Sequence, residues 1–303
     1  MNVASGESPA DRLAAALAGA AVPEQFRRAF TSTPPDPRPG QLWRARRVDT
    51  LMLVLLTQVE PTAVDAVPVT MDDDYSTEDS VVLERDASPL GVSLTVWPEL
   101  ARTLPMRVLE RYAGDLELAG ASTNPIGAVR AVGRPGRSAV SPADPVLEYR
   151  TRTSDDAAFL AAASDPSGSG ELPDTLAGAG LPTTELARIL GVSPADVLRL
   201  RRGERLIGPA EAARLAPVLG LAADDLVAAN PAPPDALLAV ASRPQRRAQV
   251  MALARVKRIS EDAAFTRAVF ETYAMAARAT GESDSAEAWE ARLDRYFQMV
   301  LDA

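Results

Sequence analysis

The chain of 303 residues contains no cysteine and no histidine. These absences exclude disulfides, thiolate nucleophiles, zinc sites built from cysteine and histidine, and every catalytic triad that uses an imidazole. Lysine is almost absent too, because Lys257 is the only one, so nearly all basic side chains are arginines. We therefore expect no metal site and no cofactor, and any catalysis would have to use Asp, Glu, Arg, Ser, Thr or Tyr.

Long apolar runs are also missing. No stretch approaches the roughly 18 consecutive apolar residues that a membrane-spanning helix needs, and the segment Met1 to Asp11 lacks the basic cluster and apolar stretch of a secretion signal. The sequence therefore predicts a cytoplasmic protein without a membrane span. The net charge of −9 argues against a protein that coats nucleic acid non-specifically, so any binding to DNA must use a local basic face.

Changes in composition along the chain predict an α+β protein of several parts. An N-terminal region with short helices between Ser8 and Thr31 is followed by runs of about 4 to 8 Val-, Leu- and Thr-rich residues, which indicate the strands of a small β-barrel. Gly- and Pro-rich stretches then separate helical segments. The predicted parts are N-terminal helices (1–39), an SH3-like β-barrel (40–118), a linker with one helix (119–171), an all-α helix-turn-helix bundle (172–230) and a C-terminal helical hairpin (231–303).

The strands of this barrel are expected at Gln41 to Arg44, Leu51 to Val59, Val64 to Met71, Ser80 to Leu83, Val92 to Trp97 and Val108 to Leu118, with a helical turn at Pro98 to Leu104. Within the linker, Ala119 to Pro145 is rich in Gly, Pro and Ser, and Val146 to Ala163 is expected to be helical. A second breaker at Ser164 to Pro173 marks a domain boundary.

The segment Leu181 to Leu200 meets the steric requirements of two short helices that cross at a large angle. Leu186 and Leu190 lie on the inner face of the first helix, and Gly191 stands where that helix must end in a left-handed residue. Ser193 is placed to cap the second helix, with Pro194 at its first position. Several positions with different steric demands thus agree in one register, which indicates a helix-turn-helix.

This stretch resembles the XRE family of repressors, the Cro and phage-repressor type, from Leu172 to Ala229. The family pattern "L-S-x-x-E-L-A-x-x-L-G-V-S" corresponds here to Leu181 to Ser193. The resemblance implies double-stranded DNA as partner, although Thr183 stands where the family often has glutamine and the start of the recognition helix holds few donors. The contacts it implies would come from Thr183, Ser193, Ala195, Asp196, Arg199, Arg201, Arg202 and Arg205.

The net charge between Leu181 and Gly220 is positive although the whole chain is negative, because this segment contains six arginines and four acidic residues. This local excess supports a phosphate-binding face. The alternative interpretation is a bundle that keeps the fold as a protein-docking module and no longer binds DNA.

The order of features from Gly40 to Leu118 resembles the MazF/PemK toxin barrel, whose "V-x-V-A-P-I-T" strand corresponds to Val64 to Thr70. Those toxins cut RNA with an arginine before the second strand and a threonine or serine after the third. Thr70 matches the second residue, but Asp49 or Thr50 occupies the position of the arginine, and that cation supplies the main electrostatic stabilisation of the transition state. We therefore expect a non-enzymatic barrel, with an RNA-cleaving enzyme as the less favoured alternative.

Three further features of the barrel have two interpretations. The run Asp72 to Asp74 could bind Mg²⁺ or Ca²⁺, but consecutive aspartates more often form a solvated turn. Trp43 and Trp97 could stack on bases, but aromatic residues in such a pattern more often fill a core.

The C-terminal region has two notable patterns. Six basic residues and no acidic ones lie between Arg243 and Arg258, which indicates either a second phosphate-binding surface or a face that pairs with acids elsewhere. Farther on, an apolar stripe along Ala264 to Ala277 and Trp289 to Leu301 predicts a helix hairpin. Its aromatic residues would form either a domain core or a surface for a homodimer or protein partner.

These observations lead to three hypotheses. The first is a sequence-specific DNA-binding transcriptional regulator, a repressor or antitoxin-like protein, and the second is a protein-interaction adaptor built on the same folds. The third and least favoured is a ribonuclease that acts through Thr70.

Overall fold

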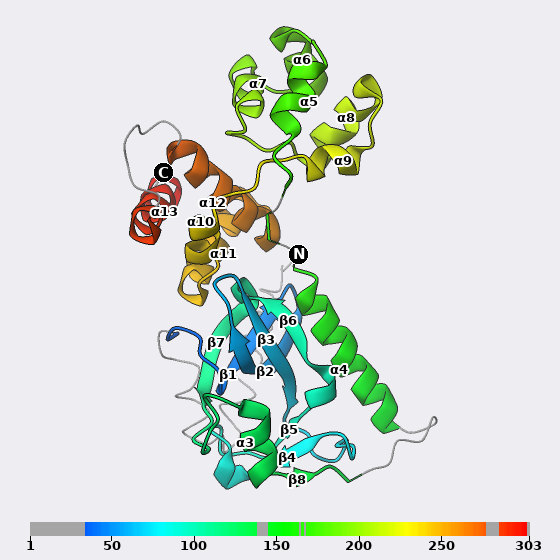
Figure 1. The fold of residues 1–303 in the computed structure, drawn as a ribbon, viewed down its shortest axis with the longest axis vertical. Helices are drawn as coiled ribbons and strands as arrows, with labels where there is room; N and C mark the ends of the chain where they lie inside the picture. Colours follow the sequence, from blue (N-terminus) through cyan, green and yellow to red (C-terminus); the bar gives the residue numbers. More distant parts are fainter. Residues whose placement is uncertain (1–33, 138–144, 164, 167, 277–284, 302–303) are drawn as a thin grey trace, which may run out of the picture. The chain divides into compact units, whose positions relative to one another are not determined.

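The computed structural model describes residues 34–137, 145–163, 165–166, 168–276 and 285–301. The helices predicted between Ser8 and Thr31 lie outside these residues. Packing divides the chain into two units, of which the first comprises Met1–Leu104 and Val108–Ala162 and the second Pro105–Arg107 and Ala163–Ala303. The first unit is built on an antiparallel sheet and the second is helical, so the α+β class is confirmed (Figure 1).

Within the described residues, the sheet of the first unit has eight strands. These are β1 (Gln41–Arg47), β2 (Thr50–Val59), β3 (Ala63–Thr70), β4 (Val81–Leu83), β5 (Leu94–Val96), β6 (Arg102–Pro105), β7 (Leu109–Asp115) and β8 (Arg134–Pro135). The strand order is β7-β1-β2-β3-β5-β4-β8, with β6 paired to β3. Among the described residues the path does not close, because β7 and β8 end it, whereas the sequence predicted a closed barrel.

Both faces of this sheet are buried, which explains the continuous apolar run in β2. Leu42 and Leu55 are paired across β1 and β2 and belong to one core cluster with Val67 and Val69 of β3. Trp43 and its partner Val54 point to the opposite face and are buried as well. A strand covered on both sides reads as an uninterrupted apolar segment instead of an alternating one.

The prediction of a linker from Ala119 to Pro145 is wrong for the first half of that segment. Helix α3 (Pro125–Val132) begins at Asn124, whose side chain accepts a hydrogen bond from the Gly127 amide at 2.9 Å. Val129 of this helix is fully buried in the core cluster of the sheet, and β8 pairs with β4 directly afterwards. Residues 119–137 therefore belong to the first unit.

Helix α4 (Pro145–Ala161) confirms the helix predicted at Val146 to Ala163 and packs on β1 and β2. Arg47 shares a strand face with Trp43 and donates a hydrogen bond to the carbonyl oxygen of Phe159 at 2.7 Å, while its guanidinium lies 4.7 Å from the centre of the Phe159 ring. Helix α4 thus covers the sheet face opposite the cluster that contains Leu55.

Five short helices follow in the second unit and enclose one apolar core. They are α5 (Leu172–Gly178), α6 (Thr183–Leu190), α7 (Pro194–Arg201), α8 (Pro209–Leu219) and α9 (Ala223–Ala228). Leu186 and Leu190, predicted as inner-face residues, are fully buried in that core together with Val197 and Leu200. The division between the two units after Ala162 lies just before the breaker predicted at Ser164 to Pro173.

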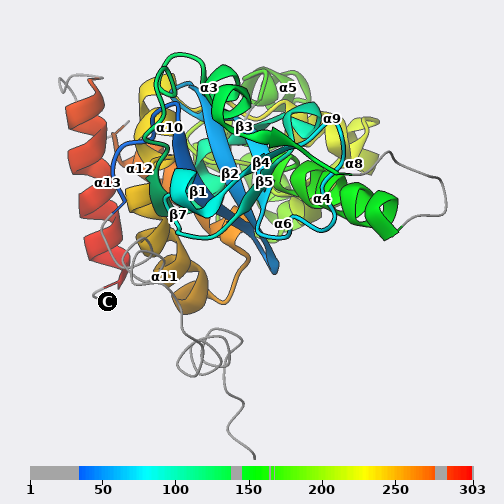
Figure 2. The same ribbon diagram turned by 90° about the horizontal axis from the view of Figure 1, so that it is seen from below.

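The last four helices form a second apolar core. They are α10 (Asp235–Ala241), α11 (Arg247–Lys257), α12 (Glu261–Ala276) and α13 (Ala286–Leu301). Helices α12 and α13 lie beside each other (Figure 2), and their aromatic side chains, including Phe265, Trp289 and Phe297, are buried. The aromatic stripe therefore forms a domain core, the first of the two interpretations.

Four single turns complete the description, namely η1 (Arg85–Ala87), η2 (Pro98–Leu100), η3 (Met106–Val108) and η4 (Pro244–Arg246). Of these, η2 confirms the first half of the helical turn expected at Pro98 to Leu104, whereas the second half of that prediction is wrong because Arg102–Pro105 forms β6. Among the helices that the structure describes, none combines the length and the apolarity needed to cross a membrane.

Candidate nucleic-acid interface

Helices α6 and α7 are joined by a turn of three residues whose conformation follows from their chemistry. Gly191 ends α6 with φ 66° and ψ 35°, a left-handed conformation that strains residues with a side chain. Ser193 has an extended backbone, and its hydroxyl oxygen accepts a hydrogen bond from the Asp196 amide at 3.1 Å. Pro194 occupies the first helical position, where its missing N–H leaves no partner unsatisfied. The predicted end of α6 and the predicted cap of α7 are both confirmed.

The outer face of α7 is largely exposed, because Val197 and Leu200 turn the opposite face into the core. Among the predicted contact residues, Ser193, Ala195 and Arg202 are exposed, whereas Thr183 at the start of α6 is half-buried. Leu198, which no sequence pattern singled out, is 43% exposed.

Most of the predicted arginines make hydrogen bonds inside the bundle. Arg199 pairs with Asp196 one turn earlier, and Arg201 donates to the carbonyl oxygen of Leu181. Arg205 lies 2.5 Å from a carboxylate oxygen of Glu211 and 3.9 Å from Asp196. These three guanidinium groups bind partners within the bundle and so stabilise it. They would have to leave those partners to become fully available to phosphate.

Two arginines are left free to reach a ligand from this face. Arg202 is 63% exposed and lies 3.8 Å from Glu204. Arg188 on α6 is 75% exposed and makes only an exposed pair with Glu185 at 3.3 Å. The exposed pair of Arg188 contributes about 0 to 1 kcal/mol, so it yields readily to phosphate. The pair of Arg202 is long, and its Glu204 side chain is 18% exposed. Arg188 was counted in the local charge but not placed in the site. Arg188 becomes a candidate because its side chain is exposed, and that exposure depends on the direction in which the folded helix turns the side chain.

Asp196 is held as an anion at the start of α7. The guanidinium of Arg199 and the hydroxyl of Ser193, which donates at 2.7 Å, lower the pKa of its carboxyl below the ordinary value. A carboxylate already bound on both sides is a poor acceptor for a base. Asp196 therefore orders the cap and the arginine, and it offers little to a duplex.

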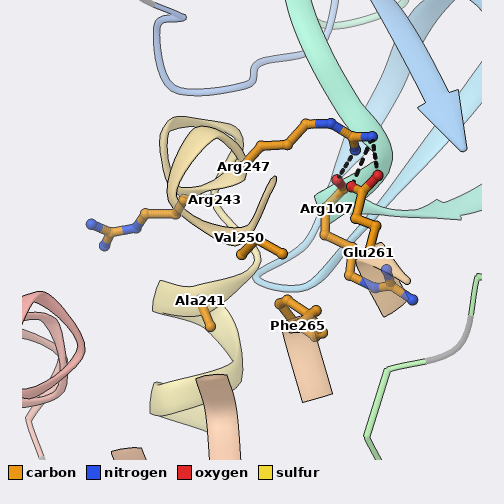
Figure 3. A pocket seen from close by; sticks show the side chains of 7 residues that line it. All are labelled: Arg107, Ala241, Arg243, Arg247, Val250, Glu261 and Phe265. Atoms are coloured by element: carbon orange, nitrogen blue, oxygen red, sulfur yellow. Dashed lines mark hydrogen bonds and ion pairs between the residues drawn. The ribbon is translucent and has the colours of Figure 1, made fainter. Parts of the chain in front are cut away.

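The basic residues between Arg243 and Arg258 divide into two groups. Arg246 pairs with Glu290 and Asp294, and Arg247 lies 2.8 Å from Glu261 and donates to the carbonyl oxygen of Arg107 at 2.6 Å. Figure 3 shows the Arg247 guanidinium turned toward Glu261 beside a small pocket, while Arg243 points away from both. Arg243 lies 3.4 Å from Glu290 and belongs with the paired residues, whereas Arg255, Lys257 and Arg258 are exposed. Pairing with acids, one of the two interpretations, therefore accounts for the buried members.

The residues that suggested RNA cleavage have hydrogen-bond partners in the first unit. The Thr70 hydroxyl accepts a hydrogen bond from the Trp97 indole at 3.1 Å, and Tyr149 of α4 also hydrogen-bonds to Thr70. Arg47, a nearby cation in the sequence, is bound to Phe159 instead. Trp43 and Trp97 are buried, which confirms the core interpretation for both.

The acidic run at Asp72 to Asp74 is a turn that pairs with arginines. Asp73 lies 2.9 Å from Arg134 and 3.9 Å from Arg137. Among the described residues no group of three or more acidic side chains is arranged to hold a metal ion. The solvated-turn interpretation thus fits the geometry better than a cation site.

Comparison of the chain with family models, with curated proteins and with solved structures finds no match.

Proposed function

We propose that α5 to α9 form a helix-turn-helix domain of the XRE type and that the protein is a DNA-binding transcriptional regulator of the repressor or antitoxin-like kind. The observation that carries this proposal is the arrangement of α6 and α7 around Gly191, with one face of α7 buried and the other open to solvent. In proteins of this architecture the second helix enters the major groove, commonly as part of a dimer on two half-sites. We interpret the N-terminal sheet as an SH3-like barrel left open at one seam.

Phosphate contacts should dominate the affinity of this surface. Arg188 and Arg202 are exposed cations on α6 and directly after α7, and their weak pairs with Glu185 and Glu204 compete little with phosphate. Of the six arginines between Leu181 and Gly220, these two are the candidates for phosphate contact, because the other four make hydrogen bonds or ion pairs within the bundle: Arg199, Arg201, Arg205 and Arg214.

The test is binding of the full-length chain to a labelled duplex, measured by fluorescence anisotropy over a series of salt concentrations. The double variant Arg188→Ala and Arg202→Ala should bind more weakly. It should also make the negative slope of log K against log[salt] shallower by about 1.8, because each phosphate contact contributes about −0.9. The matched control removes two exposed arginines of the first unit, Arg38 and Arg130, and should leave the slope unchanged. A slope equal to wild type in the first double variant would remove these residues from the interface.

An adaptor that binds another protein is the second candidate, and the apolar exposure of Leu198 favours it. Exposed apolar side chains on a helix face often mark protein contacts. A full-length chain that binds no duplex at low salt, yet forms a complex of fixed stoichiometry that Leu198→Asp abolishes, would establish the adaptor and reject the regulator.

A further inference from the structure

An apolar stripe runs along the exposed side of α7. Ala195 and Leu198 are both exposed and lie three residues apart, so they are neighbours on one helix face, and Arg202 follows one turn later. Val197 and Leu200 occupy the buried side. If α7 enters a groove as proposed above, the side chains that it presents to base edges are apolar.

The polar side chains that could replace this stripe in base recognition are already engaged. Both oxygens of Asp196 accept hydrogen bonds, one from Ser193 and one from Arg199, and Arg201 donates to the Leu181 carbonyl oxygen. The Ser193 hydroxyl also accepts from the Asp196 amide. Direct hydrogen-bond recognition by α7 is therefore limited, and apolar contact is the interaction that its surface can offer.

We infer that Ala195 and Leu198 contact the C5-methyl group of pyrimidines in the major groove. That methyl is the one apolar group on a base edge in this groove, and it distinguishes thymine from uracil and 5-methylcytosine from cytosine. The inference rests on the proposed DNA binding and adds the class of base that the site prefers.

The test compares duplexes that differ only in this methyl group. The full-length chain is titrated with an A·T-rich duplex about two turns long, roughly 21 base pairs, and with the same sequence in which deoxyuridine replaces thymidine. A G·C-rich duplex with cytosine or 5-methylcytosine gives the second arm. Loss of each contacted methyl should weaken binding about fourfold, the change that corresponds to one methylene-sized group removed from water.

The variant Leu198→Ala should reduce the ratio between the thymidine and deoxyuridine duplexes. The control Val218→Ala removes an exposed apolar side chain of similar size from α8 and should leave the ratio unchanged. Both side chains are exposed, so neither variant should shift the thermal unfolding midpoint by much.

Each outcome decides one point. Binding to the thymidine and deoxyuridine duplexes with equal affinity overturns the inference and leaves the regulator intact, whereas no binding to any duplex overturns both. A ratio that persists in Leu198→Ala also overturns it. A preference for thymidine alone identifies thymine as the source of the methyl, and a preference for 5-methylcytosine over cytosine as well identifies the methyl itself.

Discussion

Two arginine-rich segments of the second unit look alike in sequence and differ in structure. Around α7, the side chains of Arg188 and Arg202 are exposed and form weak ion pairs with Glu185 and Glu204. Around η4 and α11, Arg246 and Arg247 are nearly buried and form close ion pairs with Glu290, Asp294 and Glu261. The difference teaches that a run of basic residues indicates a binding surface only where no carboxylate from a distant segment reaches it.

The largest change in stability that would sharpen this comparison is expected from a substitution of Arg247. The substitution Arg247→Ala leaves Glu261 and the Arg107 carbonyl oxygen without this partner in a buried setting. Removing one member of a buried pair costs about 3 to 5 kcal/mol, so the free energy of unfolding of the C-terminal helices should fall by that amount. Hydrogen exchange of α11 to α13 as a function of urea measures it.

The matched change at the other segment is Arg202→Ala, which should alter stability by less than about 0.5 kcal/mol, the usual limit for an exposed site. Equal losses of stability in Arg247→Ala and Arg202→Ala would break the distinction between the two segments.

An intermediate effect on stability is expected at the residues that end α6 and α11, because both have a left-handed backbone conformation. Helix α6 ends at Gly191, but α11 ends at Arg258 with φ 54°, where a side chain is strained. Arg258→Gly should therefore stabilise the C-terminal helices by up to about 1 kcal/mol, while Gly191→Ala should destabilise the α5 to α9 bundle by about 1 to 2 kcal/mol.

A Cβ atom at Gly191 would come no closer than 3.9 Å to the Arg214 guanidinium, so the expected loss comes from the backbone alone. Thermal unfolding followed by hydrogen exchange in each bundle measures both changes. A stabilising Gly191→Ala would contradict the conformational argument.

The smallest effect is a difference in pH dependence between two aspartates of the second unit. Arg199 and Ser193 lower the pKa of Asp196, so its contribution to stability is present above the unfolded value near 3.8 and is lost as the pH falls through the folded value. Burial raises the pKa of Asp165, although Arg107 opposes it at 3.1 Å, so ionisation of Asp165 costs stability as the pH rises above 3.8.

Asp196→Asn should therefore weaken the bundle at neutral pH and flatten its acid response, and Asp165→Asn should be neutral or stabilising at the same pH. Arg107 also forms an ion pair with Asp262, and this pair remains in the Asp165→Asn variant. Unfolding free energies measured between about pH 3 and pH 7 give both slopes, and slopes of the same sign would refute the assignment.

The sequence predicts those parts of the fold that depend on near neighbours. Short apolar runs located β1 to β5 and β7 but not β6 or β8. Gly191 and Ser193 located the turn between α6 and α7, because caps and local periodicity act within one helical turn. Helix α3 was missed although Asn124 and Pro125 form a normal helix start, because the surrounding Gly and Pro residues outweighed that signal.

The roles of the arginines could not be predicted in the same way. Arg246 meets Glu290 across 44 residues of sequence, and Arg107 meets Asp262 across 155. Such pairs depend on the three-dimensional path of the chain, so composition alone cannot separate a structural cation from one that is free to bind. The closed barrel was predicted for a related reason, since strand lengths do not reveal whether the two edge strands meet.

The grouping of Pro105–Arg107 with the second unit means that this unit is not continuous in sequence. The Arg107 guanidinium lies over the Phe265 ring at 4.8 Å and binds both Asp165 and Asp262. A fragment that begins at Ala163 would lack this cation and would leave two carboxylates facing an uncovered aromatic ring. Dissection of the protein into halves should therefore carry that tripeptide with the helices, or replace both aspartates with asparagine.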